Sequence, residues 1–429
     1  MFIANQTDNP VKNTTFKVVL PFYVYAALAF LLATIFLFFS TSAFTQHYFH
    51  PKILAITHIM ALGWSTMIIL GASHQLVPVL IEGKLFSTRL AYVSFVLAAA
   101  GIPLLVYGFY QFNMGWPAKW GAILINVAIL AYLINLAISM VKSQKENVHA
   151  LFVFTAALWL LLTTFVGLLL VFNFSDVILA KDSLHYLPLH AHIGFIGWFL
   201  LLVTGVGSRL IPMFLISKYA NTKLLWAIYF LINFGLLSFI LFFLFFHETA
   251  FYYLPVTAIV VAILFFGFYC FSSYQQRIRK QVDEQMKISI FSLITMLLPF
   301  LLLITILGWL PAGTLNAKWV MLYGFLFFFG WITTIIFGMT FKTLPFIVWN
   351  KVYHLKAGFG KTPNPKDLFS NKIFKVMVLV YQAGCIFFII GVYQSNIPVL
   401  QLAGVLLVLA ALLYNWNVFK VLLHKPVQL

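Results

Sequence analysis

Three of the histidines inside the long apolar segments of this 429-residue sequence stand out, because an ionisable side chain there is costly and usually marks a functional site. His58 lies in the segment 52–81, and His190 and His192 both lie in the segment 186–216. A neutral imidazole can ligate a metal, and haem iron in particular. The alternative is that each ring only hydrogen-bonds a neighbouring carbonyl. We take all three as candidate ligands of haem iron.

An internal repeat places two of these histidines at one position. The copies read HIMALGWSTMIILGASHQLVP from His58, HIGFIGWFLLLVTGVGSRLIP from His192 and FLFFFGWITTIIFGMTFKTLP from Phe325. Gly, Trp, Gly and Pro recur at offsets 5, 6, 13 and 20, and the copies start 134 residues apart (58 to 192) and 133 apart (192 to 325). Equal offsets imply equal membrane depth, so we expect His58 and His192 to bind one haem iron together. Phe325 cannot ligate iron.

His190 precedes His192 by two positions, which turns two side chains on a helix about 200° apart. One helix can therefore present one imidazole to each of two adjacent cofactors. We expect His190 to serve a second, high-spin haem with an open coordination position. The alternative is that His190, near the helix end, only caps the helix or faces water.

Other basic side chains recur near the ends of the repeat. His74, Arg209 and Lys342 lie at offsets 16, 17 and 17 of the three copies. Such side chains normally extend toward lipid headgroups; the alternative is a polar cluster at the pseudo-threefold axis that binds an anion or gates protons. His185 lies near an external loop, where it is either solvated or stabilises haem propionates.

The composition identifies the elements that must position these residues. Apolar residues make up 63% of the chain and charged residues only 8%, against about 25% charged in a soluble domain. The chain is therefore predicted to be an all-α integral membrane protein, which excludes a soluble enzyme or a nucleic-acid binder. Twelve apolar segments are long enough to span a membrane: 17–42, 52–81, 88–110, 118–141, 148–173, 186–216, 222–246, 249–272, 286–311, 316–349, 373–394 and 397–423.

The three repeat copies divide these twelve helices into four-helix units. We expect a single membrane domain, 1–429, built from pseudo-repeats at about 17–141, 148–272 and 286–423. With both termini in the cytoplasm, only four of the 26 basic residues fall on the external side, as the positive-inside rule requires. The two cysteines lie in apolar runs and indicate neither a disulfide framework nor a thiolate metal site.

These motifs resemble a known superfamily. The segment from His58 to Pro78 resembles the second helix of the large subunits of haem-copper oxidases and nitric oxide reductases, where a haem-ligating His precedes a run with Trp and Gly that ends in Pro. His190-Ala191-His192 resembles their His-x-His pair, whose members bind a high-spin and a low-spin haem. The segment 186–216, with Gly207-Ser208-Arg209, is also similar to the NnrS family of multi-span haem proteins linked to nitric oxide stress.

The chain departs from the oxidases where copper and proton pumping are concerned. The oxidases carry the His-x-His on the tenth helix, where this chain has Tyr323 and Phe325, and the adjacent His-His pair of their copper site is missing. The acids all lie in loops or at helix ends, which argues against a pumping channel. These departures argue for a relative that keeps haem and lacks the copper site.

The resemblance implies a haem-binding protein of a bacterial inner membrane, with one or two b-type haems, that transfers electrons or handles nitric oxide or oxygen. If the chain is an enzyme, it implies an oxidoreductase that acts on a diatomic gas. A quinol or a cytochrome would be the electron donor, and other respiratory subunits would be partners alongside the lipid bilayer. The alternatives are a multi-pass transporter and a non-catalytic subunit of a respiratory complex.

Overall fold

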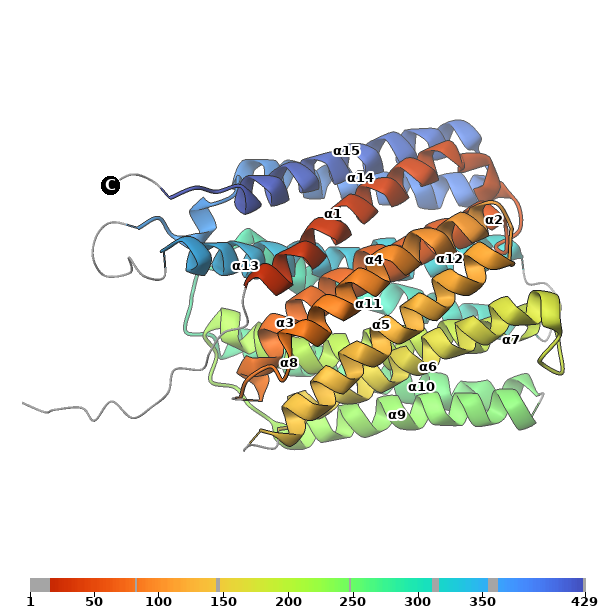
Figure 1. The fold of residues 1–429 in the computed structure, drawn as a ribbon, viewed down its shortest axis with the longest axis horizontal. Helices are drawn as coiled ribbons and strands as arrows, with labels where there is room; N and C mark the ends of the chain where they lie inside the picture. Colours follow the sequence, from red (N-terminus) through yellow and green to blue (C-terminus); the bar gives the residue numbers. More distant parts are fainter. Residues whose placement is uncertain are drawn as a thin grey trace, which may run out of the picture.

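The structure, a computed structural model, describes residues 16–81, 83–143, 147–246, 248–310, 316–353 and 362–426. Within these ranges it is an all-α bundle without a named strand, and twelve of its helical segments are long and apolar enough to cross a membrane (Figure 1). The helices are α1 (Phe16–Phe39), α2 (Pro51–His58), α3 (Met67–Leu80), α4 (Thr88–Tyr110), α5 (Trp116–Val141), α6 (Val148–Asp176), α7 (Ser183–His192), α8 (Leu201–Leu215), α9 (Thr222–Phe245), α10 (Tyr253–Gln275), α11 (Glu284–Trp309), α12 (Ala317–Phe325), α13 (Thr333–Tyr353), α14 (Asn371–Gln394) and α15 (Ile397–Leu422).

Shorter helical turns are also present among the residues that the structure describes. Three of them are π-helical and join two α-helices into one long span: η2 (Ile59–Thr66), η3 (Ile193–Leu200) and η6 (Leu326–Ile332). The others are the 3₁₀ turns η1 (Thr41–Thr45), η4 (Thr249–Tyr252) and η8 (Pro365–Asp367). The predicted spans agree with the observed ones closely, and the largest difference at any end is four residues, between 349 and 353.

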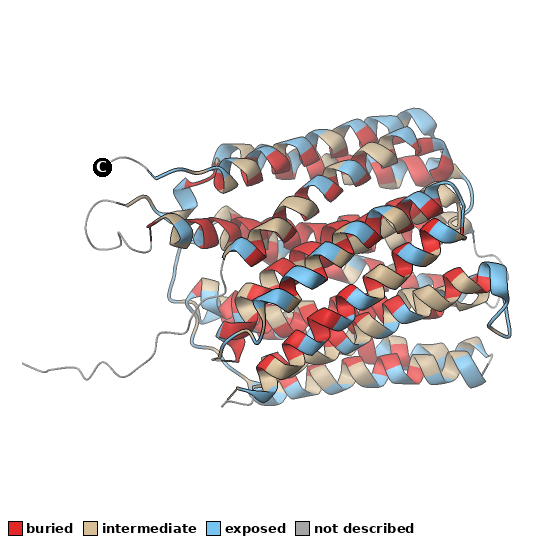
Figure 2. Cartoon of the chain, viewed as in Figure 1, coloured by how far each residue is buried: buried red, intermediate tan, exposed pale blue. Residues whose placement is uncertain are grey.

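The three spans that carry the repeat motif form the inside of the bundle. The spans Pro51–Leu80, Ser183–Leu215 and Ala317–Tyr353 have 67–78% of their apolar window buried, against 28–56% for the other nine among the described residues. Figure 2 shows buried residues gathered toward the middle of the bundle and exposed ones on its outer helices. The outer helices therefore face lipid and shield the inner three.

Each inner span widens into a π-helix at the same point of the motif. The π-helical turns begin at Ile59, Ile193 and Leu326, one residue after His58, His192 and Phe325 respectively. A π-helical turn opens the i to i+4 bonding of a helix and is common next to functional sites. The motif therefore changes the local helix geometry beside the candidate ligands.

The second glycine of the motif is required by close helix packing. A Cβ on Gly71 would lie 2.6 Å from Cβ of Phe22 on α1, and one on Gly205 would collide with Phe152 on α6. A Cβ on Gly338 would meet the α11 backbone at Gln285 at 2.7 Å. Helices α1, α6 and α11 each begin a predicted four-helix unit, so this glycine lets the first helix of each unit cross its inner span.

The motif tryptophans connect the three inner spans by hydrogen bonds. Trp64 Nε1 donates to Thr333 Oγ1 at 3.0 Å, and Trp198 Nε1 donates to Thr66 Oγ1 at 3.1 Å. Thr66 and Thr333 both lie eight positions after the start of their copy, where the second copy has Leu200. The third tryptophan, Trp331, is fully buried and its Nε1 has no hydrogen-bond partner. Two of the three motif tryptophans therefore bond a neighbouring inner span, and the third does not.

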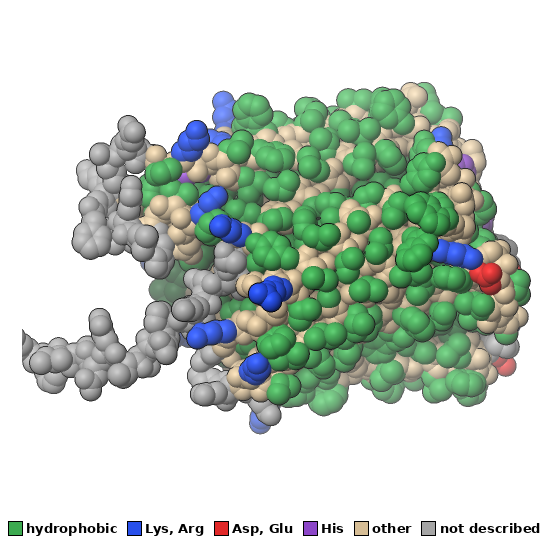
Figure 3. All heavy atoms as spheres, viewed as in Figure 1, with side chains coloured by type: hydrophobic (Ala, Val, Ile, Leu, Met, Phe, Trp, Pro, Cys, Tyr) green, Lys and Arg blue, Asp and Glu red, His purple; other side chains and the backbone are tan. Residues whose placement is uncertain are grey.

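Charge and apolar surface are arranged as a membrane-spanning bundle requires. Figure 3 shows a broad apolar band around the middle of this face, with most Lys and Arg side chains at the end from which the C-terminus emerges. Helices α2, α7 and α12 lie at the opposite end from α3, α8 and α13 (Figure 1). The candidate histidines therefore lie at the end of the bundle that carries few basic residues in this view.

Candidate haem site

His58 and His190 face each other across the interface between the first two inner spans. Their ring centroids lie 6.3 Å apart and their planes differ by only 16°. Histidine–metal bonds are about 2 Å long, so two imidazoles this close could both reach one metal centre placed between them.

Backbone carbonyl oxygens hold the Nδ1 side of both rings. His58 Nδ1 lies 2.8 Å from the carbonyl oxygen of Leu54, and His190 Nδ1 lies 3.0 Å from that of Thr163 on α6. A carbonyl can only accept, so each Nδ1 carries the proton and each Nε2 keeps its lone pair. Metal-bound histidines almost always donate their second ring N–H in this way.

A glycine on α6 makes room for the His190 ring. A Cβ on Gly167 would lie 2.8 Å from Cε1 of His190, closer than ordinary contact. Phe109 on α4 lies on the His58 side, with ring centroids 4.6 Å apart. The two imidazoles are therefore held from the outer helices α4 and α6 as well as from their own spans.

His192 faces the next interface, between the second and third inner spans. Its ring lies 5.8 Å from that of Tyr323 on α12, with planes 22° apart, and 5.1 Å from that of Phe239 on α9. Its Nδ1 lies 2.7 Å from the carbonyl oxygen of Pro188, so Nε2 again keeps its lone pair. The Tyr323 hydroxyl is buried and has no hydrogen-bond partner.

The pairing therefore differs from the one expected from equal offsets, because the ring that lies against His58 is that of His190. In a threefold arrangement, equivalent positions face successive interfaces and not one shared space. The position two residues earlier, about 200° around the helix, faces the preceding interface. His58 thus meets His190 of the second copy, and His192 meets Tyr323 of the third by the same rule.

The third copy presents aromatic side chains at the equivalent position. The Phe325 ring stacks on Phe388 with centroids 3.8 Å apart, and on Phe329 at 4.8 Å. Ile56, two positions before His58, is buried at 3% exposure. Neither position offers a metal ligand.

One cavity connects the three histidines. It has a volume of about 570 Å³, within the range of small-molecule and cofactor sites, and its lining is mostly apolar. His58, His190, His192 and Tyr323 all line it. Among the described residues, no group of three or more His, Cys, Asp or Glu side chains is placed to hold a metal ion. The donors that the cavity offers are imidazoles and one phenol, and imidazole is a ligand that haem iron accepts.

The remaining candidates lie in separate environments. His74 is buried between Phe22 and Tyr132, with ring centroids 5.4 Å from each. Arg209 is exposed, and His185 packs beside Phe243 at 5.4 Å. Lys342 forms an ion pair with Asp283. His74, Arg209 and Lys342 therefore do not share one set of partners.

Sequence reasoning missed the residues that come from neighbouring helices. Thr163 and Gly167 carry no motif of their own, and only the packing of α6 reveals their role. Tyr323 could have been found, because it lies two positions before Phe325, as His190 lies two before His192.

Comparison with known proteins supports the fold class. No family model matches the sequence, and no curated protein matches it. A solved structure of a haem-copper terminal oxidase dimer is similar to this chain with a TM-score of 0.68 and 11% identity, covering 97% of this chain and 86% of that one. The chain is thus a multi-pass, all-α membrane protein with the fold of a haem-copper terminal oxidase.

Proposed function

We propose that this chain is a b-type haem protein of a bacterial inner membrane, in which His58 and His190 would both hold the iron of one haem. The observation that carries the proposal is the pair of nearly parallel imidazoles 6.3 Å apart. Two further features support it: the Nδ1 proton of each ring is bound to a carbonyl, and both rings line one apolar cavity. The fold likeness to a haem-copper terminal oxidase agrees with this choice of cofactor.

A haem bound by two imidazoles supplies a one-electron redox centre. The residues around it would act mainly as positioning groups. Leu54 and Thr163 hold the two rings through their carbonyl oxygens. The apolar lining excludes water and would favour a less charged iron centre. The proposed role of this site is electron transfer, with a quinol or a cytochrome as donor.

A second haem position is proposed between His192 and Tyr323. His192 would be its single strong ligand, because a phenol two positions before Phe325 replaces the imidazole that faces His58 in the first site. With only one strong ligand from the protein, the iron would be able to bind nitric oxide, oxygen or carbon monoxide. The partnerless hydroxyl of Tyr323 lines the same cavity and could donate a hydrogen bond to a bound gas. The proposed role of this second site is gas binding or gas reduction.

Copper is not part of this proposal. A copper ion beside the second site would need further imidazoles, and the two nearest rings to His192 in the cavity belong to Phe239 and Tyr323. The protein would therefore bind or slowly reduce a gas rather than carry out four-electron oxygen reduction.

The test is the cofactor content of the purified full-length protein. A pyridine haemochrome assay should show b-type haem, and metal analysis should give one to two irons per chain without stoichiometric copper. His74→Ala is a matched control, because His74 also places Nδ1 on a carbonyl, that of Leu70 at 2.6 Å, but lies outside this cavity's lining. A colourless protein without iron would overturn the proposal and favour a transporter. Stoichiometric copper would restore an oxidase-type centre.

A further inference from the structure

A second cavity lies at the other end of the inner spans. It has a volume of about 780 Å³ and is lined by residues of α3, α8, α11 and α13, among them Leu76, Leu210, Leu293 and Ile336. The histidines of the candidate haem site line the first cavity, at the α2, α7 and α12 end. The second cavity is therefore a separate space with its own chemistry.

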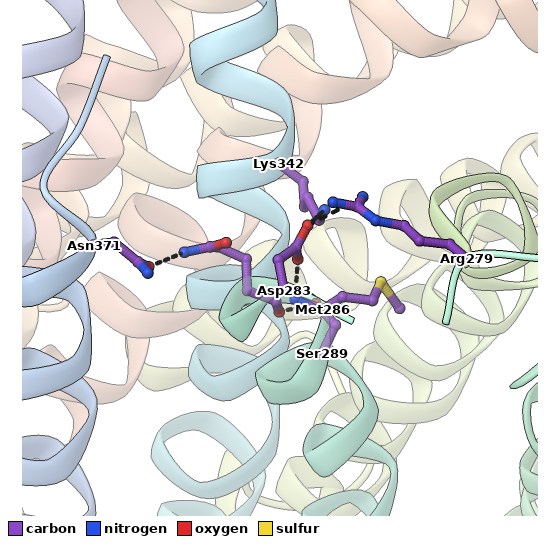
Figure 4. Close-up of polar contacts among 7 residues, drawn as sticks. Arg279, Asp283, Met286, Ser289, Lys342 and Asn371 are labelled. Carbon is purple, nitrogen blue, oxygen red and sulfur yellow. Dashed lines mark hydrogen bonds and ion pairs between the residues drawn. The ribbon is translucent and has the colours of Figure 1, made fainter. Parts of the chain in front are cut away.

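Charged side chains line one part of this cavity. Lys342 on α13 forms an ion pair with Asp283, and Arg279 Nη1 approaches the same carboxylate oxygen at 3.4 Å. Figure 4 shows Lys342 and Arg279 converging on Asp283 from two different elements. The Lys342 side chain is only 12% exposed, whereas that of Arg279 is 43% exposed. A nearly buried ammonium group thus adjoins an apolar space.

The single carboxylate does not balance these cations. The lining contains Arg279, Lys342 and Lys366 against Asp283, a net charge of +2. Asp283 is also occupied by its helix, because its Oδ1 accepts the backbone N–H of Met286 at 3.1 Å. The neighbouring Glu284 pairs with Lys287 at 3.1 Å and with Lys375 at 3.5 Å. An anionic group in this cavity would therefore find excess positive charge.

The rest of the lining is suited to a hydrocarbon chain. Apolar side chains predominate, and the hydroxyl groups of Tyr23 and Thr343 bond to each other at 3.0 Å. A small inorganic anion would leave this apolar volume unused, and a neutral hydrocarbon would leave the cations without a partner. A ligand with both parts satisfies the two regions together.

We propose that this cavity binds an amphiphile with one anionic head group, a carboxylate or a phosphate, and an apolar chain. The head group lies beside Lys342 and Arg279, and the chain lies among the aliphatic side chains of α3, α8 and α13. Such a ligand is a free fatty acid or a lipid with an anionic head. The site is independent of haem binding.

Binding of a fluorescent sixteen-carbon fatty acid to the full-length protein in detergent tests this assignment. Lys342→Gln and Arg279→Gln should each weaken binding about tenfold, the effect of losing one hydrogen bond to a charged group. Lys375→Gln is the matched control, because Lys375 pairs with Glu284, is 54% exposed and is absent from the lining. Its affinity should equal that of the wild type.

Competition identifies the head group and the source of the ligand. Lysophosphatidic acid of the same chain length should displace the probe if a phosphate is accepted, and a failure to do so would restrict the site to carboxylates. The matching fatty alcohol and inorganic phosphate should displace it only at much higher concentrations. Equal competition by the alcohol, or unchanged affinity in both Lys342→Gln and Arg279→Gln, would overturn the proposal. Haem spectra of these variants should match the wild type, so this result is distinguishable from failure of the haem proposal.

Discussion

The two interfaces made by the second inner span differ in one residue type. At the first, His58 faces His190; at the second, His192 faces Tyr323. The geometry is similar, with ring centroids 6.3 Å and 5.8 Å apart and interplanar angles of 16° and 22°. Under the proposed function, the imidazole at the first interface would give the haem iron two histidine ligands, and the phenol at the second would leave it only one strong ligand. The same backbone arrangement can thus produce a closed site and an open one.

At the third interface, the position of the candidate histidine ligand is taken by a phenylalanine. Phe325 stands where the other copies have His58 and His192, and its ring packs on Phe388 and Phe329. These aromatic rings offer no metal ligand. The three interfaces therefore form a graded series from two candidate ligands to none.

The largest expected effect is the loss of the closed site. His58→Ala and His190→Ala should each abolish the low-spin reduced spectrum, because each removes one of the two axial ligands. His192→Ala should keep it, since His192 belongs to the other interface. Absorption spectra of the three variants, normalised to protein, provide the measurement. Loss of the low-spin bands in His192→Ala, with their retention in His190→Ala, would reverse the assignment of the two interfaces.

The open site should respond to carbon monoxide. The reduced wild type should show a spectral shift, and His192→Ala should not, because the single ligand is gone. Tyr323→Phe should still bind the gas but release it about threefold to tenfold faster, the effect of losing one hydrogen bond. Flash photolysis or stopped-flow mixing measures these rates. A wild type that ignores carbon monoxide would eliminate the open site and leave an electron-transfer haem alone.

The fit of the closed site depends on Gly167. Gly167→Ala should lower haem content, because the new Cβ would lie 2.8 Å from Cε1 of His190 and displace the ring. Gly324→Ala is the matched control: Gly324 also lines the cavity, but a Cβ there would have no atom within 4 Å. Haem-to-protein ratios of the two variants give the comparison. Equal ratios would show that the His190 ring does not need this space.

The smallest expected effect concerns the hydrogen bonds between inner spans. Thr66→Val removes the acceptor of the buried Trp198 Nε1 and should lower the free energy of unfolding by about 0.5–2 kcal/mol. Ser65→Ala should be nearly neutral, because the Ser65 hydroxyl is buried without a partner. Thermal unfolding in one detergent measures both. A Thr66→Val protein as stable as Ser65→Ala would show that this bond contributes little.

Much of the architecture could be predicted from the sequence. The length of each apolar segment predicts a membrane span, and the recurring Gly, Trp and Pro positions identify the three inner spans. The ends of the twelve spans agree within four residues, and the fold class agrees with that of an oxidase. The partner of each histidine could not be predicted with the same rule. Equal offsets specify equal depth, but the rotation of neighbouring helices decides which face meets which. That rotation depends on how the spans pack against each other, which equal offsets do not specify.

The residues that hold the histidine rings in place could not be predicted from the motif, for a related reason. The carbonyl of Thr163 binds His190 and the missing side chain of Gly167 accommodates it, and neither depends on an unusual residue type. The charged cavity end also joins residues that are distant in sequence, Asp283 and Lys342. A sequence indicates which residues have unusual chemistry, and packing decides which of them act together.

The most direct test of the central claim is the electron paramagnetic resonance spectrum of the oxidised, full-length protein. Two nearly parallel imidazoles on one iron split its dπ orbitals, so the 16° between the His58 and His190 planes predicts a rhombic low-spin signal. His190→Ala should convert this signal to high spin, while His192→Ala should leave it in place. A wild type without any low-spin iron signal would contradict the assignment of His58 and His190 as a ligand pair.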